Sequence, residues 1–116
     1  MLKQGSIIMV DVNPTKVHEQ AGHRPFIILS NKHYNNVSTL VIGCSISKTS
    51  SDWVFNVDLP TGMKTTGKIK TDQLRSLDLK ARGYRFVEVA PKEVVVECLE
   101  KLGAIVDEED EEDLEA

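Results

Sequence analysis

Ser6-Ile7-Ile8-Met9-Val10-Asp11-Val12 and the later run Phe26-Ile27-Ile28-Leu29 are the two stretches that decide the fold. Both are nearly continuous apolar runs too short for helices, a pattern typical of strands buried on both faces. Such runs are expected for strands buried on both faces of a small barrel. We therefore expect both runs to form strands of a small, strongly curved sheet.

Four further segments have the composition of strands. The one at residues 53–59 alternates so that its odd-numbered apolar residues, from Trp53 to Leu59, share one face, and Pro60-Thr61-Gly62 ends it. We expect strands at residues 40–45, 53–59, 66–70 and 85–90, and short helical turns at residues 32–36 and 78–82.

One longer helix follows the last strand. Pro91 suits the first helical position, where a missing N–H costs nothing, and Glu93 suits the dipole of the first turn. The apolar stripe that should face the sheet consists of Val95, Cys98, Leu99, Leu102 and Val106. Closely spaced strands with one closing helix predict a mainly β (α+β) fold, a small SH3-like antiparallel barrel with a C-terminal helix and a short helical turn.

The length of 116 residues fits one domain, expected at residues 1–106. No apolar run approaches the roughly 20 residues that a membrane span needs. Residues 1–5 lack the apolar core of a signal peptide, so we expect a cytoplasmic protein with no membrane association.

The net charge of −4 hides an uneven distribution. Residues 107–116 contain 8 of the 18 acidic residues and none of the 14 Lys and Arg. Residues 1–106 therefore hold 10 acids and 14 bases, a net charge of +4. A block of like charges is usually a solvated, self-repelling tail, so we expect residues 107–116 to be disordered.

The cysteines and histidines indicate no metal site or disulfide. Cys44 and Cys98 are far apart, each in an apolar stretch, and are expected to be small buried hydrophobic residues. His18 and His23 lie five residues apart, and His33 has no suitably spaced partner to complete a zinc site. We expect no cofactor.

The polar segment His18-Glu19-Gln20-Ala21-Gly22-His23-Arg24-Pro25 holds an acid, two imidazoles and a guanidinium. Gly22 and Pro25 indicate a loop rather than a helix. The interval between the first two strands is long for a hairpin, and long loops in small domains are usually binding loops or disordered. Glu19 and Arg24 alone could equally be an ion pair that stiffens the loop.

Two other polar clusters accompany this loop. In residues 64–73, alternation places Lys68, Lys70 and Asp72 on one face of a strand and Ile69 on the other, which is also what a merely solvated strand face would give. At the end of the third strand lies Ser45-Ile46-Ser47-Lys48, where serine is often only a turn former. The chain has no Gly-x-Ser-x-Gly motif that would make a serine a hydrolase nucleophile.

A series of short segments follows one another over residues 3–106: Gly5, Val10-Asp11, Asn13-Pro14-Thr15, the segment from His18 to Pro25, Tyr34-Asn35-Asn36, Thr65-Thr66-Gly67, Asp72-Gln73-Leu74-Arg75-Ser76-Leu77-Asp78 and Lys80-Ala81-Arg82-Gly83. In these segments and in their order the chain resembles the MazF/PemK (Kid) family of toxins, the endoribonucleases (mRNA interferases) of type II toxin–antitoxin pairs.

The resemblance implies the CcdB/Kid/MazF-like barrel and a homodimer. It also implies cleavage of single-stranded RNA at short sequences without a metal, leaving 2′,3′-cyclic phosphate and 5′-hydroxyl ends. A cognate antitoxin with a flexible, acidic segment would block the RNA groove, and the chain's own residues 107–116 could compete with RNA in a similar way. The tail has no expected counterpart in the family.

The same resemblance assigns residues. The family's catalytic arginine falls on Arg24, with the adjacent acid at Glu19. PemK-type members place an acid–base aspartate at Asp72 and a supporting histidine at His18, and the hydroxyl after the third strand falls on Ser47. We expect RNA contacts from Lys48, Lys68, Lys70, His23 and Gln73.

Two positions depart from the family pattern. Ser47 replaces a threonine and loses the rotamer restraint of the β-branch. Lys70 replaces an arginine and lacks the fork that grips phosphate with two hydrogen bonds. Asp72 or Glu19 could take the 2′-proton, and Lys70 or Arg24 could supply charge at the leaving oxygen.

Two rival functions remain at this point. A toxin of the same fold inhibits DNA gyrase by contact and cuts nothing, although the segment from His18 to Pro25 argues against such a pure binder. A degenerate family member could bind RNA or antitoxin without cleaving, because of Ser47 and Lys70.

Overall fold

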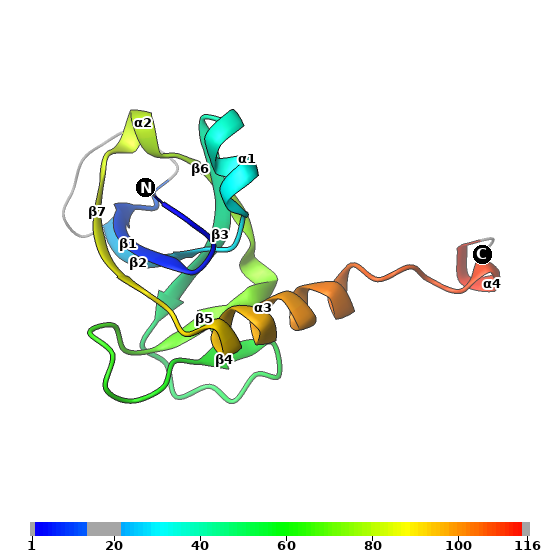
Figure 1. The fold of residues 1–116 in the computed structure, drawn as a ribbon. Helices are drawn as coiled ribbons and strands as arrows, with labels where there is room; N and C mark the ends of the chain where they lie inside the picture. The colour runs from blue at the N-terminus through cyan, green and yellow to red at the C-terminus, as the bar shows by residue number, and fades with distance from the viewer. Residues whose placement is uncertain (1, 14–21, 115–116) are drawn as a thin grey trace.

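The computed structural model describes residues 2–13 and 22–114. Its sheet is antiparallel and strongly curved (Figure 1). The strands are β1 (Ser6–Asp11), β2 (His23–Ile28), β3 (Leu40–Ser47), β4 (Asn56–Asp58), β5 (Lys68–Lys70), β6 (Arg75–Asp78) and β7 (Tyr84–Val89). The helices are α1 (Lys32–Val37), the 3-10 turn η2 (Thr71–Gln73), α2 (Leu79–Arg82), α3 (Lys92–Ile105) and α4 (Glu111–Leu114).

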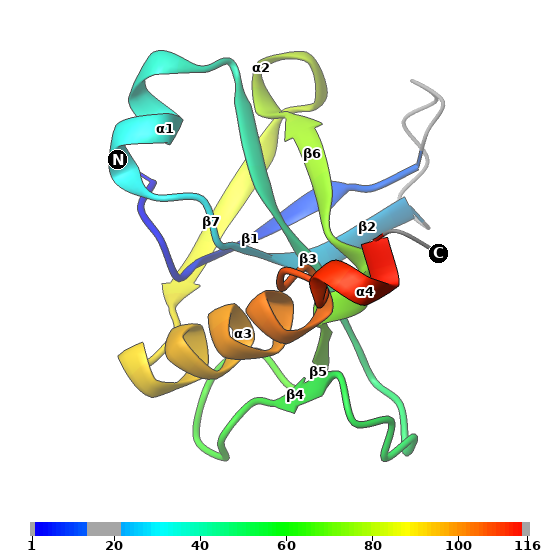
Figure 2. The ribbon, with the colours of Figure 1, turned by 90° about the vertical axis from the view of Figure 1, so that its right-hand side faces the viewer.

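The strands pair in the order β4-β5-β3-β2-β1-β7, and β6 also pairs with β3. This confirms the predicted class, a mainly β antiparallel fold with a C-terminal helix. The sheet is open rather than a closed barrel, because the pairing of the described strands ends at β4 and β7. Helices α1 and α2 lie at one end of the sheet and the β4–β5 pair lies at the other (Figure 2).

The sheet buries both faces of its central strands, as the two apolar runs predict. One face packs against α3 through a cluster that includes Ile7, Ile27, Cys44, Ile69 and Cys98. The other face encloses a second cluster made by Ile8, Val10, Phe26, Ile28, Val41, Leu77 and Leu79. Adjacent residues of β1 and β2 thus enter different clusters, which is why the two runs are continuously apolar.

Strand β3 passes very close to β2 at Gly43. A Cβ at this position would lie 1.9 Å from the carbonyl oxygen of Ile27 and 2.8 Å from Phe26 Cε1. Both neighbours belong to the buried part of β2. Only glycine fits at this close approach between the two strands.

Helix α3 docks on the sheet with a face that differs from the predicted stripe. Pro91 caps the helix one residue before its start, and the buried residues are Val94, Val95 and Cys98. The prediction is correct for Val95 and Cys98 but wrong for two exposed residues, Leu99 and Val106. Helix α3 ends at Ile105, so Val106 lies beyond the contact with the sheet.

The two cysteines are buried and unbonded, as predicted. Cys44 on β3 and Cys98 on α3 belong to the same core cluster. Burial raises the pKa of each thiol to about 12, and in Cys44 the charges of Cys98 and Asp72 add to this effect. Both thiols are therefore neutral and unreactive at physiological pH.

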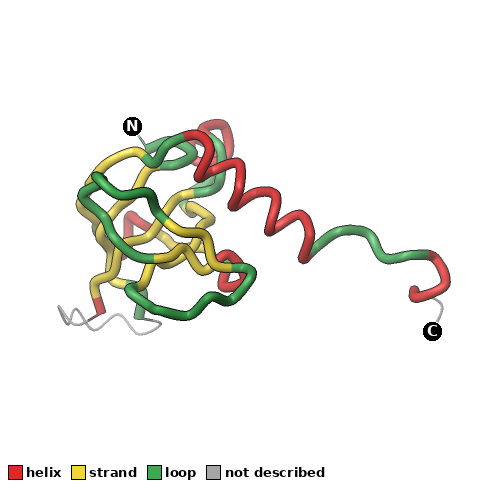
Figure 3. Tube along the Cα trace, turned by 90° about the horizontal axis from the view of Figure 1, so that it is seen from below, coloured by secondary structure: helices red, strands yellow, loops and turns green. Residues whose placement is uncertain are grey.

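The chain leaves the body of the molecule after α3. Figures 1 and 3 show residues beyond Val106 leading away from the sheet to α4, a four-residue helix with no buried residue. In the part of the chain that the structure describes, no helix is long and apolar enough to cross a membrane.

Candidate active site

Three of the predicted site residues lie at the same end of neighbouring strands. Arg24 pairs with Val10 on β1, and Ser47 pairs with Lys68 on β5. The pairing of β2 with β3 ends where Phe26 lies opposite Ser45, and Arg24 and Ser47 each lie two residues beyond that pair, at the same end. We refer to Arg24, Ser47 and Lys68, from the neighbouring strands β2, β3 and β5, as the row.

The row belongs to one face of the sheet, because Phe26 and Ser45 lie opposite each other and residues two apart along a strand point to the same side. Lys70 follows Lys68 by two residues and belongs to the same face, whereas Ile69 between them is fully buried on the other face. The predicted alternation of residues 68–70 is thus confirmed. His23 neighbours Arg24 and points to the opposite face, so the structure does not bring it into the row.

Arg24 lies in strand β2, not in a loop as Gly22 and Pro25 suggested. Pairing of β2 with β1 continues to His23, opposite Asp11. Pro25 is tolerated because the pairing of β2 with β3 begins only at Phe26, which leaves that side of the strand open beside the proline. The Arg24 side chain is exposed, and its Nη1 donates to the carbonyl oxygen of His23 at 3.0 Å. The strand fixes the position of its backbone.

Backbone contacts hold together the two ends of the long β1–β2 connection. Val12 N–H donates to the carbonyl oxygen of Gly22 at 3.1 Å. Arg82 Nη1 donates to the carbonyl oxygens of Asp11 and Asn13, both at 2.7 Å. A Cβ on Gly22 would lie 2.2 Å from Asn13 Nδ2 and 2.5 Å from Asp11 Oδ1, so a larger residue where the chain re-enters the sheet would displace these two side chains.

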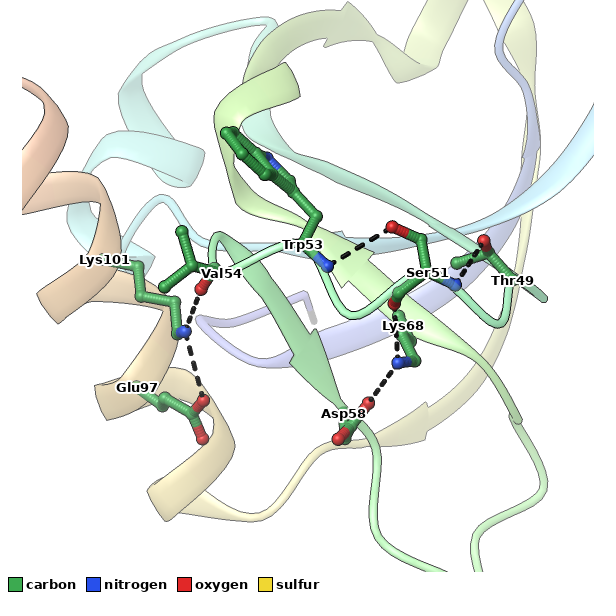
Figure 4. A network of polar contacts seen from close by, with 8 residues as sticks. All are labelled: Thr49, Ser51, Trp53, Val54, Asp58, Lys68, Glu97 and Lys101. Atoms are coloured by element: carbon green, nitrogen blue, oxygen red, sulfur yellow. Dashed lines mark hydrogen bonds and ion pairs between the residues drawn. The ribbon is translucent and has the colours of Figure 1, made fainter.

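Ser47 is the last residue of β3, two residues beyond the predicted end of this strand. Gly67 allows β5 to approach it, since a Cβ there would lie 2.7 Å from the carbonyl oxygen of Ser47. Lys68 Nζ forms an ion pair with Asp58 Oδ1 at 3.5 Å and donates a hydrogen bond to the carbonyl oxygen of Ser51 at 2.7 Å (Figure 4). Lys68 thereby ties the loop after β3 to the β4–β5 pair.

Asp72 lies in the turn η2, directly after β5, rather than on the strand face predicted for it. Its neighbour Thr71 is fully buried, and both Thr71 N–H and Thr71 Oγ1 donate to the carbonyl oxygen of Phe55. The Asp72 side chain is exposed and accepts a hydrogen bond from Trp53 Nε1 at 2.8 Å. The turn fixes the backbone and leaves the carboxylate open to solvent.

Trp53 does not belong to the strand predicted at residues 53–59. Strand β4 begins at Asn56 rather than at Trp53, because Trp53 takes part in a turn in which Asn56 N–H donates to its carbonyl oxygen. The Trp53 side chain is 52% exposed and packs edge to face against Phe55. The alternation of residues 53–59 gave no indication that the indole would contact Asp72.

Four other predicted residues lie at the margin of this site or outside the described residues. Lys48 follows β3 and Gln73 ends η2, and both are exposed. His18 and Glu19 lie outside the described residues. Among residues 2–13 and 22–114, no group of three or more His, Cys, Asp or Glu is arranged to hold a metal ion.

Glu88 on β7 anchors the connection between β4 and β5. Its carboxylate accepts hydrogen bonds from Thr65 N–H and Thr65 Oγ1, both at 2.7 Å, and from Lys64 N–H at 3.2 Å. Burial alone would raise the pKa of Glu88, but these hydrogen bonds outweigh it and lower the pKa. The contact orients the segment that leads into Lys68 and Asp72.

We expect Glu88→Gln to destabilise the protein by about 1 kcal/mol at pH 7, the usual value of a hydrogen bond. The folded-state pKa lies below the unfolded one, so the stabilisation is complete above the ordinary glutamate pKa, about 4.3, and is lost as the pH falls through the folded value. Urea unfolding at pH 7 and again below about pH 4 should show this difference shrink. A Glu100→Gln control on the exposed side of α3 should have little effect; equal stabilities of Glu88→Gln and the wild type at pH 7 would contradict the prediction.

The described part of the site combines cations, a hydroxyl and a carboxylate. Arg24, Lys68 and Lys70 provide positive charge along one face, Ser47 lies between them in the row, and Asp72 borders them. Such a set can bind a phosphate, stabilise negative charge that develops on it and accept a proton from a nearby hydroxyl.

Comparisons with known proteins identify the family. Residues 3–106 match the family described as PemK-like, MazF-like toxin of type II toxin-antitoxin system. The chain is 34% identical over 112 residues to Endoribonuclease PemK of Escherichia coli, a match that covers 90% of this chain and 82% of the relative.

The fold is similar to that of solved members of the family. The crystal structure of MazF (Form-I) from Deinococcus radiodurans has a TM-score of 0.82 and 31% identity, covering 92% of this chain and 97% of that one. The MazE-MazF complex (Form-II) of the same organism contains a chain with a TM-score of 0.80 and 27% identity, covering 93% of this chain and 97% of that one. The chain therefore belongs to the family of PemK-like, MazF-like toxins of type II toxin–antitoxin systems.

Proposed function

We propose that this toxin is an endoribonuclease that cleaves single-stranded RNA, including mRNA, at short sequences without a metal ion. The observation that carries the proposal is the row of Arg24, Ser47 and Lys68 on one sheet face, with Lys70 and Asp72 beside it. The relative named Endoribonuclease PemK supports the reaction class.

The cleavage uses only groups of the RNA and of the chain. The 2′-oxygen forms a bond to phosphorus while the bond from phosphorus to the 5′-oxygen breaks, which leaves a 2′,3′-cyclic phosphate. The 2′-proton passes to a base, and the leaving 5′-oxygen takes up a proton to become a hydroxyl. No water or metal enters this step.

Each site residue has a role in this scheme. Arg24 stabilises the charge on the phosphorane, and Ser47 donates a hydrogen bond to a phosphate oxygen. Asp72 or Glu19 accepts the 2′-proton, with His18 assisting, and Lys70 or Arg24 provides charge at the leaving oxygen. Further contacts to the RNA come from Lys48, Lys68 and Gln73, whereas His23, on the opposite face from Arg24, is not part of this scheme.

The decisive experiment incubates the purified protein with a long single-stranded RNA in excess EDTA and maps the new ends. Discrete cuts with cyclic phosphate and 5′-hydroxyl ends would support the proposal and reveal the recognised sequence. A second RNA of different sequence is tested in the same way. If both RNAs remain intact, this result contradicts the proposal and favours the gyrase-inhibiting or non-cleaving alternatives.

The partners follow from the same family. The MazE-MazF complex supports an antitoxin partner, which we expect to cover the basic face with a flexible acidic segment. A homodimer is supported by the apolar side chains that the edge strand β7 exposes, namely Tyr84, Phe86 and Val89. Because mRNA is the proposed substrate, we expect the protein to act in the cytoplasm.

Removal of residues 107–116 should strengthen RNA binding, because it changes the net charge from −4 to +4. We expect about a tenfold gain in affinity at low salt and a smaller gain at higher salt, since phosphate contacts are salt-dependent. Titration of a non-cleavable, 2′-deoxy single strand measures the effect. A full-length control with the eight tail acids changed to Gln or Asn should behave like the truncated chain; an affinity unchanged in both proteins would show that the tail does not oppose RNA.

A further inference from the structure

The only tryptophan of the chain touches the carboxylate that the proposed mechanism uses. Trp53 Nε1 donates to Asp72 Oδ2 at 2.8 Å, although the two residues are 19 positions apart in sequence. Asp72 is exposed, so its side chain would otherwise exchange between staggered rotamers. A hydrogen bond to an ionised acceptor is stronger than one between neutral groups and is able to select one rotamer.

The indole is itself held in place. Trp53 N–H donates to Ser51 Oγ at 3.3 Å, and its ring packs against Phe55 with centroids 5.5 Å apart at an interplanar angle of 63°. Ser51 N–H donates in turn to Thr49 Oγ1 at 3.1 Å (Figure 4). Contacts of the Trp53 backbone with Ser51 and of the Trp53 ring with Phe55 therefore fix the position of the indole.

Other elements of the fold anchor the loop that carries Trp53. Lys68 from β5 binds the carbonyl oxygen of Ser51, and Lys101 from α3 binds the carbonyl oxygen of Val54 (Figure 4). Thr71, the residue before Asp72, binds the carbonyl oxygen of Phe55 through its backbone and its hydroxyl. The loop and the turn η2 are thus connected at two points, one through Thr71 and one through Trp53 and Asp72.

We propose that Trp53 is a positioning residue for Asp72: its indole N–H holds Oδ2 and so leaves Oδ1 directed at the 2′-hydroxyl of the bound RNA. This inference rests on the proposed ribonuclease function. Without the N–H, the Asp72 side chain rotates freely, and the fraction of enzyme with a correctly placed base falls. Small misplacements of a catalytic group are costly, so we expect about a tenfold loss of rate.

The kinetic test compares Trp53→Phe with the wild type on a short single-stranded RNA that contains one cleavage site. Phenylalanine keeps an aromatic ring beside Phe55 but has no N–H. We expect kcat to fall about tenfold with KM unchanged, because RNA binding does not depend on the rotamer of Asp72. The matched control is Val54→Ala, the next residue of the same loop, whose backbone carbonyl oxygen makes the contact with Lys101; its kcat should equal that of the wild type.

The spectroscopic test uses Trp53 as its own probe, because no other tryptophan contributes emission. Asp72→Ala should change the intensity and the maximum of the indole emission in the absence of RNA. Asp52→Ala, which removes a carboxylate next to Trp53 in sequence, should not. This measurement needs no substitution of Trp53 and so stands even where Trp53→Phe folds poorly.

Three results would overturn the inference: full kcat in Trp53→Phe, a rise in KM with kcat unchanged, or an emission spectrum unaffected by Asp72→Ala. The first two would show that the indole N–H does not act through the base, and the third that the contact is not formed in solution. A wild-type protein that leaves every RNA intact would instead contradict the proposed function itself.

Discussion

Arg24→Ala should reduce RNA cleavage by at least about a hundredfold while leaving the fold unchanged. Arg24 is the cation at the β2 end of the row with Ser47 and Lys68, and its guanidinium is the group best suited to grip two phosphate oxygens. Removal of one group that stabilises charge in a transition state typically costs two to three orders of magnitude in kcat. Because the side chain is exposed, its truncation should cost little stability.

The measurement is single-turnover cleavage of a single-stranded RNA, with thermal unfolding as the check on the fold. Arg24→Lys should fall between the wild type and Arg24→Ala, because lysine keeps the charge but not the fork. Arg85→Ala is the matched control, since Arg85 is an exposed arginine on β7, across from Met9 rather than in the row. Near-normal cleavage by Arg24→Ala would remove Arg24 from the mechanism.

Gly43→Ala should destabilise the protein by about 3 kcal/mol or more and could prevent folding altogether. The added methyl group would lie 1.9 Å from the carbonyl oxygen of Ile27 and close to the ring of Phe26. Both obstacles belong to the fully buried part of β2, so relief requires β2 and β3 to move apart. Overpacking in a core usually costs 1–3 kcal/mol, and a clash with backbone belongs at or above the upper end of that range.

Gly103→Ala is the matched control, because a Cβ at Gly103 meets no atom within 4 Å. Gly103 lies inside α3, where alanine is the better helix former, so this substitution should stabilise the protein by about 0.5–1 kcal/mol. Urea unfolding of both variants gives the two free energies of unfolding. Similar stability of Gly43→Ala and the wild type would show that the two strands do not approach this closely.

The buried strands could be predicted from the sequence because the apolar pattern of their own residues is enough to identify them. β1 and the second half of β2 are nearly continuous apolar runs, and β5 shows a single apolar residue between two lysines; all three have the burial that these patterns predict. The end of β2 at His23 could not be predicted in this way, because its first three residues are held by pairing with β1 rather than by apolar side chains.

Strand β6 was missed for the same reason. Only Leu77 of its four residues is buried, and pairing with the first half of β3 makes it a strand. Asp78 ends β6 and also caps α2, accepting hydrogen bonds from Lys80 N–H and Ala81 N–H, so the turn is visible in the sequence while the strand before it is not. Long-range pairing of this kind leaves no periodic pattern.

The residue types of the site could be predicted, but their arrangement could not. The family resemblance indicated Arg24, Ser47 and Asp72, whereas the row across the sheet and the opposite orientation of His23 depend on the register of β2 against β3 and β1. The contact of Trp53 with Asp72 depends on a loop whose course is set by Lys68, Lys101 and Thr71. Each of these three residues comes from a different element.

The pairing of β1 with β7 has a consequence for the synthesis of this toxin. It joins Ser6 to Val89 and Val10 to Tyr84. The second neighbour of β1, the first of these strands to be synthesised, is therefore β7, the last one. Contacts of such large sequence separation slow folding, and a nascent chain emerges from its N-terminus onward. During translation β1 therefore keeps an open edge until nearly the whole sheet has left the ribosome, and a chain that stops before residue 84 lacks the strand that covers it.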